Sequence, residues 1–155
     1  MEIRNDGLVF ERASDTEALS SFHCGVRELD LLIHKKEGGL RNFLQENACE
    51  AFLVYHDGVP VAVFVYSNAV LATEDGDYAA TEIDFIAVKK EYRDQGIGRR
   101  ILEVISQNSR QNDRNFLTAG AFCNKKYSAL GFYQKCGFEQ LSERQGNIVP
   151  MFKEL

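Results

Sequence analysis

The segment between residues 86 and 102 constrains the fold more than any other part of this 155-residue chain. Its apolar beginning, residues 86–88, leads into a short loop with Arg93 and two glycines, Gly96 and Gly98, and an apolar stripe at helical spacing follows at once. The first turn of a helix carries unpaired backbone N–H groups and the positive end of the helix dipole. Glycines let a phosphate approach that backbone, because no Cβ intervenes. The segment therefore predicts a strand, a pyrophosphate-binding loop and a helix.

Two other phosphate-binding patterns fit this segment less well. The chain has no G-x-x-x-x-G-K-[ST] sequence, so it gives no support for a P-loop nucleotidase. Gly96-x-Gly98 lacks the third glycine of the dinucleotide-binding fingerprint, and we do not expect the strand before it to lie near the start of a βαβ unit. An ordinary helix start with solvated basic residues is the structural alternative. The strand, the arginine and the apolar helix together favour the phosphate loop.

The rest of the chain predicts a mixed α/β domain, with helices covering the faces of a sheet. Helical periodicity early in the chain is followed by two strands joined by an Asp57-Gly58 turn, and then strands and helices alternate. No repeat, low-complexity tract or linker interrupts the sequence, so we expect a single domain over residues 1–155. The expected strands are 8–10, 51–55, 60–66, 81–88, 116–122, 137–141 and 148–153, the expected helices lie within 14–47 and at 96–111 and 125–135, and a polar loop is expected at 73–77.

Composition limits the class of protein further. The chain has 23 Asp and Glu against 18 Lys and Arg, a net charge of −5, whereas proteins that bind nucleic acid without sequence preference are usually basic. No apolar run approaches the roughly 20 residues that span a bilayer, so we expect no membrane partner. Because the N-terminus shows no export signal, we expect a cytoplasmic protein with its four cysteines as free thiols. No set of His, Cys and carboxylates has zinc spacing, so no metal is expected.

Two motifs together resemble the GNAT superfamily of acyl-CoA-dependent N-acyltransferases. Arg93-Asp94-Gln95-Gly96-Ile97-Gly98 is similar to that family's motif A, [R/Q]-x-x-G-x-[G/A]. A second segment, Ala129-Leu130-Gly131-Phe132-Tyr133-Gln134-Lys135-Cys136-Gly137-Phe138, resembles its Ala-x-x-[F/L]-Tyr-x-[R/K]-x-G-F segment, and the two stand in the family's order. Together with the strand pattern, the resemblance covers essentially the whole chain. It implies a GNAT-like, mostly antiparallel sheet of about six or seven strands flanked by helices, with a splayed pair of strands at the cofactor site. It also implies acetyl-CoA as co-substrate.

The resemblance also implies which residues bind coenzyme A. Backbone amides of the loop would hold the pyrophosphate, and the strand before the loop would pair with the pantetheine arm, with an N–H near Ile86 polarising the thioester carbonyl. Lys126 stands where family members often carry a cofactor-contacting asparagine, and Asn124 is the candidate replacement. The implied cofactor-binding residues are Ile86, Ala87, Val88, Arg93, Asp94, Gln95, Gly96, Ile97, Gly98, Arg99 and Asn124.

Three residues are candidates for proton transfer. Tyr133 falls on the family's frequent general acid, which protonates the departing CoA thiolate, and its structural alternative is a buried aromatic beside Phe132. A lysine-like amine, with a pKa of about 10.4, needs a base to remove its proton. Glu82 and Asp84 share one face of the expected strand and are the candidates. Each carboxylate could equally be a solvated strand residue, so the identity of the base stays open.

The distribution of charge predicts the kind of acceptor. Between Arg41 and Lys89 the chain holds eight Asp and Glu and neither Lys nor Arg, while residues 89–100 hold five basic and two acidic side chains. Such an acidic stretch attracts a cationic amine, for example a polyamine, an aminoglycoside-like amine or a lysine side chain, and repels the phosphate backbone of tRNA. We therefore expect direct N-acetylation of a primary amine on a small-molecule or peptidyl acceptor.

One further element keeps alternatives open. Phe22-His23-Cys24-Gly25-Val26-Arg27-Glu28-Leu29-Asp30 resembles an F-x-C-G-x-x-x-L-D element in one branch of the superfamily, which includes toxins that acetylate aminoacyl-tRNA and also members that are not toxins. A turn that leads into a helix explains these residues without any function, and we favour that explanation for Cys24. The alternatives are a toxin-like acetyltransferase of aminoacyl-tRNA and a non-catalytic acyl-CoA-binding module. The terminal strand 148–153 could contribute to a homodimer.

Overall fold

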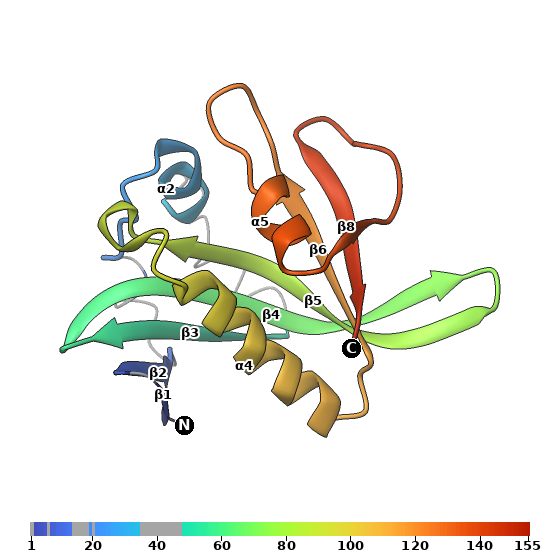
Figure 1. Ribbon diagram of the computed structural model, residues 1–155, viewed down its shortest axis with the longest axis horizontal. Helices are drawn as coiled ribbons and strands as arrows, with labels where there is room; N and C mark the ends of the chain where they lie inside the picture. Colours follow the sequence, from blue (N-terminus) through green and yellow to red (C-terminus); the bar gives the residue numbers. More distant parts are fainter. Residues whose placement is uncertain (1, 6, 14–18, 20, 35–47) are drawn as a thin grey trace. The chain divides into compact units, whose positions relative to one another are not determined.

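The computed structural model describes residues 2–5, 7–13, 19, 21–34 and 48–155 (Figure 1). Its eight strands form a sheet in the order β1-β2-β3-β4-β5-β6-β8-β7. The pairs β1–β2, β2–β3, β6–β8 and β7–β8 are antiparallel, and β5–β6 is parallel. The elements are β1 (Glu2–Asn5), β2 (Leu8–Arg12), α2 (Arg27–Ile33), β3 (Cys49–His56), β4 (Val59–Thr73), β5 (Gly76–Val88), η1 (Lys90–Tyr92), α4 (Ile97–Gln111), β6 (Phe116–Phe122), α5 (Leu130–Lys135), β7 (Glu139–Gln140) and β8 (Ile148–Glu154). Because α4 connects the parallel strands β5 and β6, the strand before the predicted phosphate loop does begin a βαβ unit, and the contrary expectation is wrong. The predicted mixed, mostly antiparallel sheet with helices is confirmed.

The chain forms two compact units. The first contains the described residues of 1–66 together with 85–101, and the second contains residues 67–84 and 102–155. Strands β4 and β5 and helix α4 contribute residues to both units. The single domain that the sequence predicts stays a prediction.

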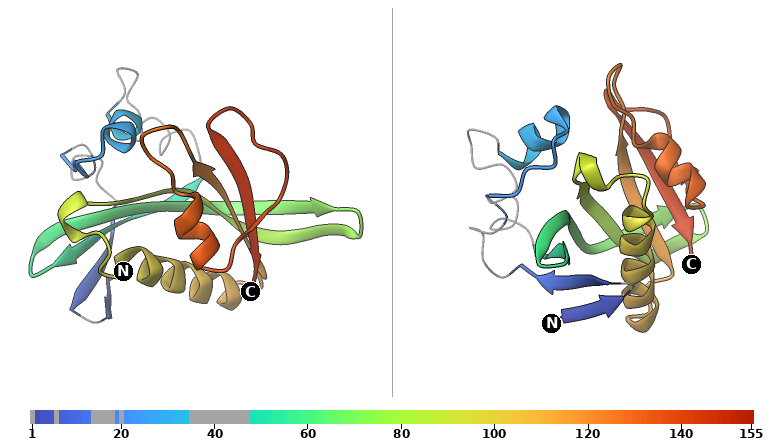
Figure 2. Two further views of the ribbon diagram at one scale, coloured as in Figure 1. Left: turned by 45° about the horizontal axis from the view of Figure 1, so that its top comes forward. Right: turned by 60° about the vertical axis from the view of Figure 1, so that its left-hand side comes forward.

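The first unit has an aromatic core on strands β2, β3 and β4. The ring centroids of Phe52 and Phe64 lie 5.1 Å apart, and those of Phe10 and Phe64 lie 6.1 Å apart. The blue strands in Figure 2 are β1 and β2, which pair in the antiparallel sense beside this core. Asp57 and Gly58 have φ angles of 51° and 78°, as the tight turn between β3 and β4 requires. The predicted Asp-Gly hairpin is therefore confirmed.

The second unit is built around β6. This strand pairs with β8 along its whole length and with β5 from Ala80 to Ile83. The Arg114 guanidinium donates hydrogen bonds to the carbonyl oxygens of Ala69 on β4, at 3.2 Å, and Ala80 on β5, at 2.7 Å. One side chain thus joins both strands of the long hairpin that carries the acidic residues of β5.

Two predicted boundaries in the second unit are wrong for local reasons. The side-chain oxygen of Asn124 accepts hydrogen bonds from the N–H groups of Lys126 and Tyr127, both at 2.8 Å. This turn competes with helix formation, so the helix predicted over 125–135 begins at Leu130. The loop predicted at 73–77 is shorter, because the Thr73 hydroxyl donates to the carbonyl of Gly76 at 2.8 Å and closes a tight turn. Strands β4 and β5 consequently extend towards this turn beyond their predicted ends.

The early helical region is described in part. Helix α2 lies within the predicted span 14–47, while residues 14–18, 20 and 35–47 of that span lie outside the described residues. Strand β1, with the polar sequence Glu-Ile-Arg-Asn, was not predicted. None of the helices in the described part of the chain is long and apolar enough to cross a bilayer.

Candidate active site

The predicted phosphate loop leads directly into helix α4. Its first helical hydrogen bond runs from the N–H of Arg100 to the carbonyl of Gly96, at 3.0 Å. The N–H groups of Ile97, Gly98 and Arg99 therefore precede the hydrogen-bonded ladder of the helix. These three N–H groups, at the positive end of the helix dipole, are suited to hold a phosphate.

Two residues of this loop have a left-handed backbone conformation, with positive φ. Asp94 has a φ of 60° and Gly96 a φ of 81°. A Cβ at Gly96 would meet no atom within 4 Å, so the glycine is required by backbone conformation, and the space beside it is open. The Arg93 side chain donates from Nε to the carbonyl of Val88 at 3.3 Å, which holds it at the end of β5. The loop therefore combines a sharply turned backbone, open space beside Gly96 and a nearby arginine, and these features are compatible with binding of a pyrophosphate.

Replacing Gly96 with alanine tests this loop. Because a left-handed conformation costs a residue with a Cβ about 1–2 kcal/mol, Gly96→Ala should lower the free energy of unfolding by that amount and weaken coenzyme A binding. Gly131→Ala is the matched control, since Gly131 is helical, has no atom within 4 Å of its Cβ position, and should gain up to about 1 kcal/mol. Urea denaturation and titration calorimetry with coenzyme A measure both effects. Equal affinity and stability of Gly96→Ala and wild type would contradict the role of the loop.

Glu82 and Asp84 lie on one face of β5 and are both half-buried. The Thr118 hydroxyl, at the register position opposite on β6, donates a hydrogen bond to the Glu82 carboxylate. Asp84 has a side-chain hydrogen bond with Ser67 on β4. Burial raises the pKa of Glu82, and burial raises the pKa of Asp84 from 3.8 to about 6, with a smaller contribution from the Glu82 charge. Partial burial argues against the alternative that these are ordinary solvated strand residues.

The charge of this carboxylate pair is not neutralised within the described part of the chain. The partners of both groups are hydroxyls, and no Lys or Arg contributes to their pKa shifts. One oxygen of Asp84, Oδ2, is buried and has no hydrogen-bond partner among the described residues. A buried carboxylate oxygen without a donor is costly unless a ligand supplies one. The arrangement can therefore accept a cationic or proton-donating group.

Tyr133 lies in α5 and is 6% exposed. Its ring packs against Phe132 and Phe138, with centroids 5.2 Å and 5.1 Å away. Burial raises the pKa of its hydroxyl, and the charges of Tyr127 and Glu82 raise it further. The hydroxyl therefore stays protonated at neutral pH, which a general acid requires. The buried-aromatic alternative is also correct as a description of the ring, and it is compatible with a reactive hydroxyl.

The structure places Glu82, Asp84 and Tyr133 in the second unit, where the Glu82 charge contributes to the raised pKa of the Tyr133 hydroxyl. It adds two residues that the sequence did not reveal, Ser67 and Thr118. In the sequence, each of these residues is recognisable only as a hydroxyl side chain on an expected strand. Their hydrogen bonds to the carboxylates depend on how neighbouring strands pair.

The strand residues assigned to the pantetheine arm lie beyond the β5–β6 register. That register ends at Ile83 and Ala119, although β5 continues to Val88. The backbone of Ile86, Ala87 and Val88 is thus outside the paired part of β5 and β6, as expected if these two strands splay apart at the cofactor site. Contacts of these three residues with the cofactor stay a prediction.

Cofactor contact by Asn124 also stays a prediction. Its side-chain oxygen is used within its own turn, so the side-chain NH₂ group is what it could offer to a ligand.

Cys24 has a structural role. It is 1% exposed, and burial raises the pKa of its thiol to about 11, so the reactive thiolate is scarce at neutral pH. This agrees with the interpretation of its motif as a turn. Within the described ranges, no group of three or more His, Cys, Asp or Glu could hold a metal ion.

A family model confirms the resemblance. Residues 47–140, more than half of the chain, match the model described as the acetyltransferase (GNAT) domain. The chain therefore belongs to the GNAT family of acetyltransferases, and acetyl-CoA is its co-substrate. No curated protein matches the chain.

Solved structures share the fold over nearly the whole chain. AtaTR bound with AcCoA has a TM-score of 0.69 at 19% identity, covering 97% of this chain and 95% of that one. AtaT complexed with acetyl-methionyl-tRNAfMet has a TM-score of 0.64 at 16% identity, covering 95% and 94%. A protein from Desulfovibrio desulfuricans assigned to the GNAT family has a TM-score of 0.70 at 19% identity, covering 95% and 98%. At these identities the comparison shows the fold alone.

Proposed function

We propose that the protein transfers an acetyl group from acetyl-CoA directly to a primary amine that is cationic before it reacts, on a small-molecule or peptidyl acceptor. The observation that supports this acceptor is the Glu82–Asp84 pair, which is half-buried, held by hydroxyls, and lacks a neutralising cation among the described residues. A half-buried pair of negative charges favours a protonated amine over a neutral or anionic acceptor.

The same pair supplies the base. An alkylammonium group has a pKa of about 10.4 and must lose a proton before its nitrogen can attack. Asp84, with a pKa of about 6, is ionised at neutral pH and can accept that proton and release it to solvent. The amine nitrogen then bonds to the acetyl carbonyl carbon and the carbon–sulfur bond breaks. Tyr133 donates its hydroxyl proton to the departing sulfur, and the second amine proton replaces it.

The loop residues would hold the co-substrate. Acetyl-CoA supplies the activated acetyl thioester, and the N–H groups of residues 97–99 with Arg93 would bind its pyrophosphate. The N–H near Ile86 is the proposed donor to the thioester carbonyl oxygen.

A panel of three acceptors of equal length tests the charge preference. We compare 1,4-diaminobutane, butylamine and 4-aminobutanoate, whose far ends are positive, neutral and negative, by release of the coenzyme A thiol. One charge a few ångströms from a half-buried carboxylate is worth about 1 kcal/mol, so kcat/KM should fall about fivefold at each step. The differences should shrink as salt is added. Equal rates, or a preference for 4-aminobutanoate, would contradict an acceptor site that favours positive charge beyond the reacting ammonium group.

A second candidate is acetylation of aminoacyl-tRNA. It is supported by the F-x-C-G-x-x-x-L-D element and by the full-length likeness to AtaT complexed with acetyl-methionyl-tRNAfMet. Charged tRNA and diamines should be offered to the same enzyme preparation, and the chain should be expressed without any partner protein. Faster acetylation of charged tRNA, with arrested growth, would replace the first proposal. Coenzyme A binding without turnover on either acceptor class would favour a non-catalytic acyl-CoA-binding module.

A further inference from the structure

The F-x-C-G-x-x-x-L-D element contains a hydrogen-bonded clamp. The carboxylate of Asp30, in α2, accepts hydrogen bonds from the N–H of Cys24 at 2.7 Å and from the N–H of Gly25 at 3.0 Å. One side chain therefore fixes the two residues of the turn before the helix, and a charged acceptor makes both bonds strong.

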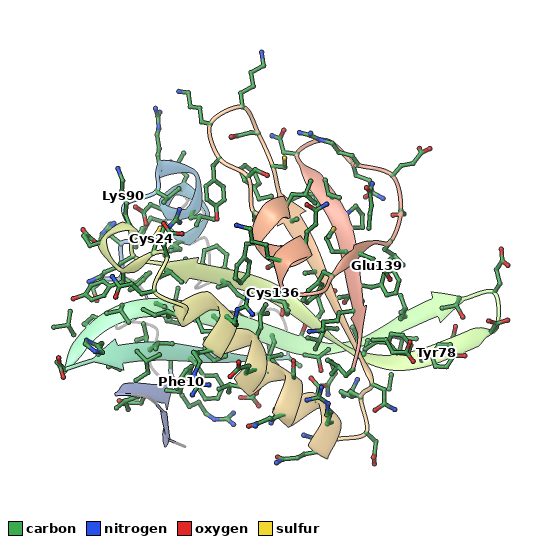
Figure 3. All side chains as sticks on the ribbon, viewed as in Figure 1. Phe10, Cys24, Tyr78, Lys90, Cys136 and Glu139 are labelled. Carbon is green, nitrogen blue, oxygen red and sulfur yellow. The ribbon has the colours of Figure 1, made fainter. Side chains whose placement is uncertain are left out.

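The clamped turn lies against the residues that lead into the phosphate loop. The Cys24 carbonyl accepts a hydrogen bond from the N–H of Lys90 at 2.7 Å, and Figure 3 shows Cys24 and Lys90 side by side. Gly25 has a φ of +84°, and a Cβ there would lie 3.3 Å from the Lys90 Cβ. The Lys89 ammonium lies 5.8 Å from the centroid of the Phe22 ring. The turn and residues 89–90 are thus packed together closely.

Among the described residues, these contacts include a backbone hydrogen bond that anchors the entry to the phosphate loop. The N–H of Lys89 donates to the carbonyl of Val61 on β4 at 2.8 Å, and the N–H of Lys90 donates to the turn. The short helix η1 follows at once and ends where Arg93 begins the loop. If the turn loosens, the entry to the loop loses the hydrogen bond at Lys90 and keeps the one from Lys89 to β4.

We propose that Asp30 is a positioning residue for acetyl-CoA binding, because it holds the Cys24–Gly25 turn against Lys90 and so fixes the backbone that leads to Arg93. This inference rests on the proposed function in one respect, the assignment of the CoA pyrophosphate to residues 93–99. All the residues involved lie in the first unit.

Electrostatics alone predicts the opposite effect of removing Asp30. Coenzyme A is a polyanion, so loss of a nearby negative charge should strengthen its binding. Positioning predicts weaker binding, because the N–H groups of the loop lose their fixed arrangement. The sign of the change in affinity therefore separates the two effects.

The experiment measures the dissociation constant of coenzyme A by titration calorimetry, which needs no turnover. Asp30→Ala, which loses both hydrogen bonds to the turn, should bind coenzyme A about tenfold more weakly, an effect the size of one charge-assisted hydrogen bond. Asp30→Asn, which keeps one acceptor oxygen, should fall between Asp30→Ala and wild type. Gly25→Ala, which disturbs the same contact from the turn side, should also weaken binding. With a working amine, KM for acetyl-CoA should rise while KM for the amine stays constant.

Glu91→Gln is the matched control for charge. Glu91 is an exposed acidic residue on η1, next to the loop but outside the clamp, so its replacement should leave affinity unchanged or raise it. Wild-type or tighter binding by both Asp30 variants would overturn the inference, and so would equal rises in KM for both substrates. If Asp30→Ala does not fold, Asp30→Asn and Gly25→Ala decide. Failure of the wild type to bind coenzyme A would instead overturn the proposed function.

Discussion

Replacing Tyr133 with phenylalanine should lower kcat by about 10²- to 10⁴-fold, the usual contribution of a positioned general acid. The ring packs between Phe132 and Phe138 and would keep its place, so the free energy of unfolding should change by no more than about 1 kcal/mol. Coenzyme A affinity should match that of the wild type. Thiol release, calorimetry and urea denaturation measure the three quantities.

A matched substitution separates the hydroxyl of Tyr133 from tyrosine hydroxyls in general. Tyr78 lies on β5, is 41% exposed and has a ring contact with Phe116, so Tyr78→Phe makes the same chemical change away from the site. It should retain wild-type kcat. If Tyr133→Phe is also fully active, the proton for the CoA thiolate comes from another group, and Tyr133 is a packing residue.

Replacing Asp84 with asparagine should lower kcat/KM by about 10²- to 10⁴-fold and change its pH dependence. In the wild type, burial raises the pKa of Asp84 to about 6, so kcat/KM should fall about tenfold per pH unit below that value as the base is protonated. The residual activity of Asp84→Asn should lack this fall near pH 6. Rates measured from pH 5 to 9 with 1,4-diaminobutane test both expectations.

The same carboxyl group should cost the protein stability at neutral pH. Since the pKa of Asp84 is higher in the folded chain than in the unfolded chain, the folded state binds more protons between about pH 4 and 6. The free energy of unfolding therefore has its full contribution from protonated Asp84 below about pH 4. That contribution is lost as the pH rises through 6 and the carboxyl group ionises. Asp84→Asn should be at least as stable as the wild type at pH 8 in urea denaturation. A large loss of stability at pH 8 would contradict an uncompensated buried charge.

Two other acid-to-amide changes provide controls for Asp84→Asn. Asp77→Asn, at an exposed position of the same strand, should leave kcat/KM and its pH dependence unchanged. Glu82→Gln keeps a group that can accept from Thr118, so it should lower activity less than Asp84→Asn. A larger loss in Glu82→Gln would assign the base to Glu82.

Sequence alone predicted the parts of the fold that depend on neighbours along the chain. The tight turn at Asp57 and Gly58 and the helix after Gly96 follow from local conformational preferences, and both are present. The helix predicted from residue 125 was wrong at its start, because a single side-chain amide at Asn124 stabilises a turn instead. Sequence patterns do not show whether the turn or the first helical hydrogen bonds are more stable at this position.

The part of the candidate site that depends on the alternation of side chains along one strand was predictable from the sequence. The two-residue spacing placed Glu82 and Asp84 on one face of β5. Their burial and their partners were not predictable, since Thr118 comes from β6, 36 residues further along the chain, through the register of two parallel strands. Sequence patterns within one element do not specify which residues lie opposite in another.

The position of both carboxylates on a single strand has a consequence for insertions in the β4–β5 hairpin. Inserting one residue between the hairpin turn and Glu82 would, if the parallel pairing with β6 slides by one place, turn both carboxylates to the opposite face together. Inserting two would restore both. An odd number of inserted residues should therefore move both carboxylates to the opposite face of the sheet, and an even number should keep them on the same face.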